Sequence, residues 1–300
     1  MSFRCKLCRA DRHGRVFTLG SRPQYQAASC SECGLFQALY DWTAAAPPAV
    51  TKVLEAESGD WVSDAEMEAH AAKAHEFAAR LEREGRVAGA TVLDIGCGEG
   101  HFLQECARRG AARVVGQEFR LAPIRYARDH CGVADVRTAP LEDGSAWPDG
   151  EFDVVCSLDV VEHVHDLRGF FEQCLRVMRP DGYMLHVTPG SDSITHHLGR
   201  IASRLGAGGI AGTLTNVQHV SDLMGGPHVH LMGRRQVAWL AERHHLVAAS
   251  EYVPSYSYSD GHYAAVVPQL RWMPRAIGTQ VFRGVRRVIR NKLVFGMTRL

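Results

Sequence analysis

Four cysteines near the start of the chain give the sequence its most specific chemical signal. They form two C-x2-C pairs, Cys5 with Cys8 and Cys30 with Cys33. Each pair can fold into a knuckle, and two knuckles place four thiolates at the corners of a tetrahedron, the geometry that zinc adopts in structural sites. Because four protein ligands leave no open coordination position, such a metal would stabilise a fold rather than activate water. We therefore predict a separate small zinc-ribbon module over residues 1–43, with iron in the same site or reduced structural cysteines as the alternatives.

A glycine-rich segment further along the chain could cradle a nucleotide-like ligand. It reads TVLDIGCGEGH from Thr91 to His101, so an apolar strand runs into a helix through Gly96, Gly98 and Gly100. Glycines at such a junction let the backbone turn tightly and approach a ligand beside a helix N-terminus. The dinucleotide fingerprint G-x-G-x-x-G would require a glycine where this chain has His101. The spacing therefore disfavours NAD.

An acidic residue at the end of the next strand would hold the ribose hydroxyls of such a ligand. That residue is expected about twenty positions after the glycine loop. Glu118, at the end of the run VVGQE, lies twenty residues after Gly98. The two features are in register, and simple strand-to-helix packing of the glycines is the alternative explanation.

The elements that would position these residues alternate between strand and helix. The strand signals cover Thr91–Ile95, Arg113–Gln117, Val133–Arg137, Phe152–Ser157, Tyr183–Thr188, Leu246–Val253 and Tyr263–Val267. Helical patterns cover Asp64–Glu84, His101–Arg109, Leu121–His130, Asp166–Met178 and Arg234–His244. Continuous apolar strands that alternate with helices indicate a parallel sheet covered on both faces, so we predict a doubly wound α/β fold.

The strand-loop motifs together resemble those of the class I S-adenosylmethionine-dependent methyltransferases. VLDIGCGEG matches the family's first motif and VVGQE its second, and the resemblance extends to Phe152–His163 and Arg179–Gly182. It covers about residues 87–267 and implies a mostly parallel seven-stranded sheet with S-adenosylmethionine as the methyl donor. The residues it implies for binding the donor are Asp94, Gly96, Gly98 and Gly100 at the methionyl and sugar portion, Glu118 at the ribose, Ser157 and Leu158 beside the sulfonium, and Leu141 or Glu142 at the adenine.

The resemblance also bears on the atom that receives the methyl group. Relatives that methylate planar amines carry N/D-P-P-Y/F after the fourth strand, and those that methylate pyrimidine carbons carry Pro-Cys there, whereas this chain reads SLDVVEH up to His163. A hydroxyl acceptor is therefore favoured, and a base should remove its proton. Among 16 histidines, we expect His228 or His163 to be that base, with structural packing as the alternative for each. Zinc modules ahead of this domain resemble bacterial enzymes that act on sugars, polysaccharide precursors and secondary metabolites.

The remaining sequence divides into connecting and terminal regions. We expect a linker and leading helix over residues 44–86 and a methyltransferase domain over 87–270, with a lid insertion at about 190–230. Residues 271–300 contain eight basic residues and no acidic one, and their apolar residues recur at helical spacing. We predict a basic amphipathic helix there, docked on the body of the protein, with an anionic membrane surface as the alternative.

Composition limits the class of protein and its partners. The chain has 300 residues, 34 basic and 33 acidic, with 46% hydrophobic residues, as in soluble globular proteins. Residues 1–270 hold 26 basic and 33 acidic residues, a net charge of −7, which makes nucleic acid an unfavoured partner. The start of the chain lacks the apolar region of a signal peptide, so we expect a cytoplasmic protein with a small-molecule or glycan-precursor acceptor. An RNA methyltransferase and a non-catalytic cofactor-binding module are the alternatives.

Overall fold

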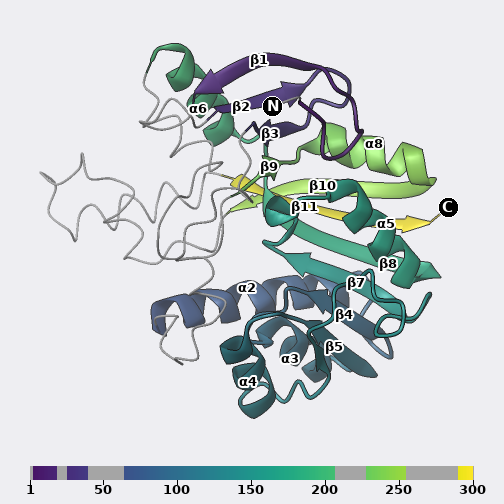
Figure 1. Ribbon diagram of the computed structural model, residues 1–300. Helices are drawn as coiled ribbons and strands as arrows, with labels where there is room; N and C mark the ends of the chain where they lie inside the picture. The colour runs from purple at the N-terminus through teal and green to yellow at the C-terminus, as the bar shows by residue number, and fades with distance from the viewer. Residues whose placement is uncertain (1–2, 19–25, 40–63, 207–227, 255–289, 300) are drawn as a thin grey trace, which may run out of the picture.

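The computed structural model describes most of the chain. The described ranges are residues 3–18, 26–39, 64–206, 228–254 and 290–299 (Figure 1). They form a seven-stranded and a four-stranded sheet. Most of the predicted linker and the predicted strand Tyr263–Val267 lie outside the described residues.

The larger sheet has the strand order β10-β11-β8-β7-β4-β5-β6. Its strands are β4 (Thr91–Ile95), β5 (Arg113–Gln117), β6 (Val136–Arg137), β7 (Phe152–Leu158), β8 (Met178–Pro189), β10 (Leu246–Pro254) and β11 (Arg290–Arg299). The five strands from β6 to β8 are parallel, and β11 runs antiparallel to both of its neighbours. The predicted doubly wound, mostly parallel seven-stranded sheet is confirmed.

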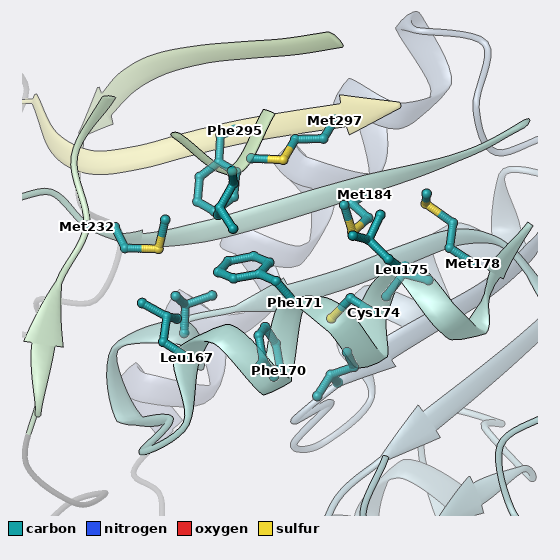
Figure 2. Packing of buried hydrophobic residues seen from close by; sticks show 14 of the residues in the cluster. Leu167, Phe170, Phe171, Cys174, Leu175, Met178, Met184, Met232, Phe295 and Met297 are labelled. Carbon is teal, nitrogen blue, oxygen red and sulfur yellow. The ribbon is translucent and has the colours of Figure 1, made fainter. Parts of the chain in front are cut away.

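Helices cover both faces of this sheet (Figure 1). They are α2 (Asp64–Arg83), α3 (His101–Arg108), α4 (Leu121–Asp129), α5 (Leu167–Val177) and α8 (Arg234–His244), with a 3-10 turn η1 (Val161–His163) after β7. Helix α6 (Ile194–Arg204) lies beside the four-stranded sheet instead (Figure 1). Buried residues of α2, α3 and α4 form one hydrophobic cluster, and those of α5 and α8 belong to another. Figure 2 shows part of the second cluster, where Phe171 of α5 faces Phe295 of β11.

The C-terminal residues correct the prediction of a helix. Residues 290–299 form β11, which pairs with β10 on one side and β8 on the other. Leu293, Val294 and Phe295 are each fully buried. Consecutive burial requires apolar surroundings on both faces, which an interior strand has and a helix docked by one face lacks. The rest of the predicted tail, residues 271–289, lies outside the described residues.

The N-terminal cysteine region is joined to the rest of the molecule rather than separate. Its strands β1 (His13–Thr18), β2 (Gln26–Cys30) and β3 (Phe36–Ala38) continue into β9 (His230–Leu231), which gives the sheet order β1-β2-β3-β9. Cys5, Cys30 and Cys33 belong to the same hydrophobic cluster as α5 and α8. Phe17, Ala27, Phe36 and Ala38 form a small cluster of their own with Leu231 of β9. The N-terminal segment thus has only a small core and shares the rest with the larger unit.

The sequence pattern did not reveal helix α6, which begins inside the predicted lid insertion. Ser193 caps it, since its hydroxyl accepts a hydrogen bond from the backbone N–H of His196 at 3.3 Å. Its exposed apolar residues are Ile194, Leu198, Ile201 and Leu205. Among the described residues, no helix combines the length and apolarity needed to cross a membrane.

Candidate functional site

The glycine loop between β4 and α3 offers open space at one of its three glycines. Gly96, Gly98 and Gly100 have φ angles of +69°, +51° and +81°, a region that favours glycine. A Cβ at Gly96 would lie 2.5 Å from the Val160 side chain, and one at Gly100 would lie 2.9 Å from that of Ala127. At Gly98 a Cβ would meet no atom of the described part of the chain within 4 Å. The outer glycines are therefore required by packing, whereas the space over Gly98 is accessible to a ligand.

A buried carboxyl group lies directly before this loop. Asp94 is only 2% exposed, and its Oδ1 has no hydrogen-bond partner among the described residues. Burial raises the pKa of Asp94 to about 8; nearby Glu118 acts in the same direction and Lys73 opposes it. An unpartnered buried carboxyl is costly unless a donor or cation reaches it. The residues therefore fit a ligand with a cationic or hydrogen-bond-donating group, such as S-adenosylmethionine.

Glu118 lies at the adjacent strand exit, as predicted, and its turn holds it in place. Its Oε1 accepts hydrogen bonds from the backbone N–H groups of Phe119 and Arg120 at 2.8 and 3.0 Å. Its Oε2 accepts one from Arg120 Nη2 at 3.0 Å. Since β4 and β5 are paired neighbours, Glu118 and Asp94 follow the same edge of the sheet. A carboxylate has further lone pairs, so Glu118 could also accept from two ribose hydroxyls.

The other residues implied for donor binding differ in how deeply they are buried. Ser157 is fully buried, and its hydroxyl shares a 2.7 Å hydrogen bond with His186 Nδ1. Its neighbour Leu158 is half-buried at the end of β7. Leu141 is buried in the hydrophobic core, whereas Glu142 is exposed. The roles of these four residues stay predictions.

The structure brings the two candidate bases together from distant parts of the chain. The His163 and His228 rings have centroids 4.8 Å apart and meet edge to face. Glu162, which sequence reasoning had not selected, lies beside them: its Oε1 is 3.8 Å from His228 Nε2. Its Oε2 accepts a hydrogen bond from Thr188 Oγ1 at 2.9 Å. The only sequence signal for Glu162 was its position immediately before His163.

This histidine and carboxylate cluster can exchange protons or hold a cation. Ligand atoms of Glu162, His163 and His228 all lie within 4.8 Å of one another. Glu162 is 1% exposed, and burial raises its pKa, reinforced by nearby Asp159. The neighbouring His230 differs, because burial lowers its pKa to about 3 and its Nε2 donates to the Val164 carbonyl at 3.0 Å. His230 is thus a neutral structural group rather than a base.

A buried ion network lies beside the cluster. Asp159 follows β7 with a φ of +63°. Lys73 of α2 binds its Oδ2 at 3.0 Å, and Lys292 of β11 binds its Oδ1. Burial alone would raise the pKa of Asp159, but the two ammonium groups outweigh it and hold the pKa well below its usual range. The network ties α2, β7 and β11 together at the edge where Asp94 and Glu162 lie.

The four N-terminal cysteines have the geometry of a tetrahedral metal site. The Sγ atoms of Cys5 and Cys33 are 3.5 Å apart, as are those of Cys8 and Cys30, and all four lie within 4.8 Å of one another. Zinc with four Zn–S bonds of about 2.3 Å would place its sulfurs about 3.8 Å apart. The donor set therefore fits a structural zinc ion.

Comparison with known proteins relates the larger unit to methyltransferases. Residues 64–250 match a family model described as "Methyltransferase domain". A "Ubiquinone biosynthesis O-methyltransferase" of Acinetobacter baumannii (strain AYE) is 35% identical over 112 residues, which are 36% of this chain and 47% of that protein. The Pseudomonas paraeruginosa protein of the same name is 42% identical over 105 residues, 34% of this chain and 44% of that protein. The chain spans about half the length of the curated relatives it matches.

Solved structures share the fold at low sequence identity. The plantazolicin methyltransferase BpumL, in complex with a triazolic desmethylPZN analog and SAH, has a TM-score of 0.51 and 14% identity over 84% of this chain and 95% of that one. The magnesium protoporphyrin IX methyltransferase of Synechocystis PCC 6803 with bound SAH has a TM-score of 0.50 and 13% identity over 86% and 96%. At such identities the likeness shows the fold alone.

Proposed function

This chain belongs to the methyltransferase domain family, and from that premise we propose that it transfers a methyl group from S-adenosylmethionine to a hydroxyl of a small molecule. The acceptor classes we propose are sugars and precursors of polysaccharides or secondary metabolites. One observation carries the proposal: the open space over Gly98 and the Asp94 Oδ1 that has no partner among the described residues adjoin the segment that leads to the paired histidines. Gly96 and Val160 are in contact at that junction.

Donor binding would use the loop and the two acids. When bound, S-adenosylmethionine supplies an electrophilic methyl group on a sulfonium. The N-terminus of α3 follows Gly100 and has no side-chain cap, so its N–H groups are available to a ligand. Asp94 would accept from the methionyl portion and Glu118 from the ribose hydroxyls. Helix α2 adds the positive charge of Lys73, held on Asp159.

Acceptor activation would use the histidine and carboxylate cluster. His228 takes the proton of the acceptor hydroxyl as the oxygen attacks the methyl carbon in line with the C–S bond. A C–O bond forms, the C–S bond breaks with its electron pair left on sulfur, and the products are a methyl ether, a neutral thioether and an imidazolium. Glu162, 3.8 Å from His228 Nε2, would stabilise that imidazolium. His163 lies close enough to serve as the alternative base.

Two separate observations support a hydroxyl acceptor. The β7 exit carries neither an N/D-P-P-Y/F turn nor a Pro-Cys pair, but Asp159 and the Glu162-His163 pair. The curated relatives from Acinetobacter and Pseudomonas are named O-methyltransferases. The zinc site would stabilise the N-terminal region without entering the reaction, because four cysteines complete its coordination.

The first experiment is calorimetric titration with S-adenosylmethionine, S-adenosylhomocysteine and NAD. We expect micromolar binding of the first two and none of NAD. Gly98→Arg should abolish binding because its side chain fills the open space over the loop. Gly110→Arg is the matched control, since Gly110 has a φ of +89° and open space around it but lies after α3. Preference for NAD, or equal loss in both variants, would refute the donor assignment.

The second experiment is an acceptor screen with radiolabelled S-adenosylmethionine. Hydroxylated sugars and phenols form one panel, and amines and an RNA transcript form the others. Labelled methyl ether in the first panel alone is the expected result. Transfer to amines or RNA would replace the hydroxyl assignment, and binding of the donor without transfer to any panel would favour a non-catalytic module.

A further inference from the structure

The first cysteine knuckle, around Cys5 and Cys8, is bonded to the segment that follows His163 in the histidine and carboxylate cluster. The Lys6 carbonyl accepts the backbone N–H of Arg168 at 3.2 Å, and Lys6 Nζ donates to the His165 carbonyl at 3.3 Å. Arg9 forms an ion pair with Asp166. These contacts lie two to five residues beyond His163, between η1 and the first turn of α5.

The second knuckle, around Cys30 and Cys33, is hydrogen-bonded to the segment that follows His228. Gln236 is 2% exposed, and its Nε2 donates to the Cys33 carbonyl at 2.6 Å. Its Oε1 accepts the backbone N–H of Gly233 at 2.7 Å, so the same side chain also fixes the start of α8. Arg235 Nη2 donates to the Glu32 carbonyl at 2.6 Å. Both bonds bridge the module and a helix more than two hundred residues later in the chain.

Strand β3 connects these two sets of contacts. It pairs with β9, with Gln37 opposite His230, and the Ala38 N–H donates to the Val229 carbonyl at 3.0 Å (Figure 1). The Gln37 side chain accepts the Lys6 N–H at 2.9 Å and donates to the Arg4 carbonyl at 3.0 Å. Gln37 thus connects the first knuckle to the strand that holds the residues after His228.

The segment after His163 and the segment after His228 are bonded to each other next to the candidate bases. The Val229 N–H donates to the Glu162 carbonyl at 2.9 Å, and His230 Nε2 donates to the Val164 carbonyl at 3.0 Å. The His163 and His228 rings lie immediately beside these bonds. The donor loop is held differently, because Gly96 and Cys97 both donate to the Gln117 carbonyl on the neighbouring strand.

We infer that the four-cysteine module is a positioning element for the acceptor side of the site: it clamps the segment carrying Glu162 and His163 against the segment carrying His228. Gln37 and Gln236 are the positioning residues, because their side chains connect the cysteine knuckles to the segments that carry the histidines. The inference rests on the proposed function for the chemical roles of the histidines. It assigns the module a task distinct from donor binding and from holding a partner.

The test compares the full-length zinc-loaded protein with the same protein after chelation by 1,10-phenanthroline. With selectively labelled histidine, NMR should show a nuclear Overhauser effect between the His163 and His228 imidazoles, whose centroids are 4.8 Å apart. We expect this signal to disappear on zinc removal while the affinity for S-adenosylhomocysteine changes less than twofold. A signal that survives complete zinc removal, or a purified protein with no metal in the cysteine site, would overturn the inference.

A variant that keeps the zinc site separates a loss of positioning from the general unfolding that zinc removal could cause. Gln236→Met preserves the side-chain length but removes both side-chain hydrogen bonds of Gln236, the one to the Cys33 carbonyl and the one from the Gly233 N–H. Amide hydrogen exchange over residues 228–237 should therefore accelerate by at least about tenfold. Gln104→Met is the matched control, because the Gln104 side chain donates to the His130 carbonyl at the surface and has no recorded contact with the cysteine module among the described residues. Equal acceleration in both variants, or none over residues 228–237, would overturn the inference.

Failure of the inference and failure of the proposed function give different results. If the zinc-loaded wild type does not bind S-adenosylhomocysteine, the proposed function fails while the imidazole contact can still be measured. If the wild type binds it and the contact persists without zinc, only the positioning role fails.

Discussion

The proposed donor side and the proposed acceptor side of the site are built in opposite ways. Asp94, the three glycines and Glu118 lie within 25 consecutive residues, and one pair of adjacent strands positions them. Glu162, His163 and His228 depend on bonds between segments separated by 66 to more than 200 residues, including His230 with Val164 and Gln236 with Cys33. The donor side is therefore a local property of the sequence, whereas the acceptor side exists only in the folded chain.

The largest effect that would sharpen this comparison is expected at the candidate base. His228→Gln should lower kcat for methyl transfer by about 10²- to 10⁴-fold, the usual contribution of a general base. The affinity for S-adenosylhomocysteine should stay within twofold. Steady-state kinetics with calorimetry measures both, and His75→Gln, at an exposed histidine of α2, is the control. Full activity in His228→Gln would transfer the role of base to His163.

The next effect should fall on the donor side alone. Asp94→Asn should weaken binding of S-adenosylhomocysteine about 10- to 100-fold, because the amide cannot ionise as the Asp94 carboxyl should when a cationic or hydrogen-bond-donating group of the ligand reaches it. Asp153→Asn is a suitable control, since Asp153 accepts the Thr91 N–H at 2.7 Å at the opposite end of β4. Unchanged affinity in Asp94→Asn would show that the carboxyl does not contact the donor.

These expectations differ in how far the sequence alone supported them. The strands Thr91–Ile95 and Arg113–Gln117 and the helix Arg234–His244 have their predicted bounds, because local periodicity and glycine spacing determine them. The partners of Glu162 and Asp159 come from β8, β11 and α2, and no local pattern encodes such pairings. Residues 290–299 show the same limit: the helix predicted over residues 271–300 extended through them, whereas they form a buried strand, and their pairing with β8 and β10 is not encoded by a local pattern.

A smaller effect concerns the stability of the ligand-free protein between about pH 4 and pH 8. Because the folded-state pKa of Asp94 is raised to about 8, the folded state keeps a proton that the unfolded state releases above about pH 4. Stability should therefore fall as the pH rises from about 4 to 8. Asp94→Asn removes this loss, so its melting temperature should exceed that of the wild type by several degrees at pH 8 and approach it near pH 4. Parallel melting curves at all pH values would contradict the assignment.

The smallest effect has the opposite sign and arises beneath the acceptor side. His186 is fully buried among the rings of Phe171 and Phe295, and burial lowers its pKa to about 3. The unfolded state takes up a proton below about pH 6.5 that the folded state does not, so stability is lost as the pH falls from there towards 3. His186→Phe should flatten this acid slope in denaturant titrations, whatever it does to stability at neutral pH. An unchanged slope would show that His186 takes up its proton in the folded state.

The position of β11 has a consequence for the order in which the protein can assemble during synthesis. This strand lies between β10 and β8, yet it is the last of the sheet strands to leave the ribosome. Until it arrives, the backbone edge of β8 is unpaired and Phe171 lacks its contact with Phe295. Unpaired edges and exposed apolar surface favour association between nascent chains. The half of the sheet that carries Asp94 and Glu118 can close early in translation, but the half that carries the candidate bases must wait for β11.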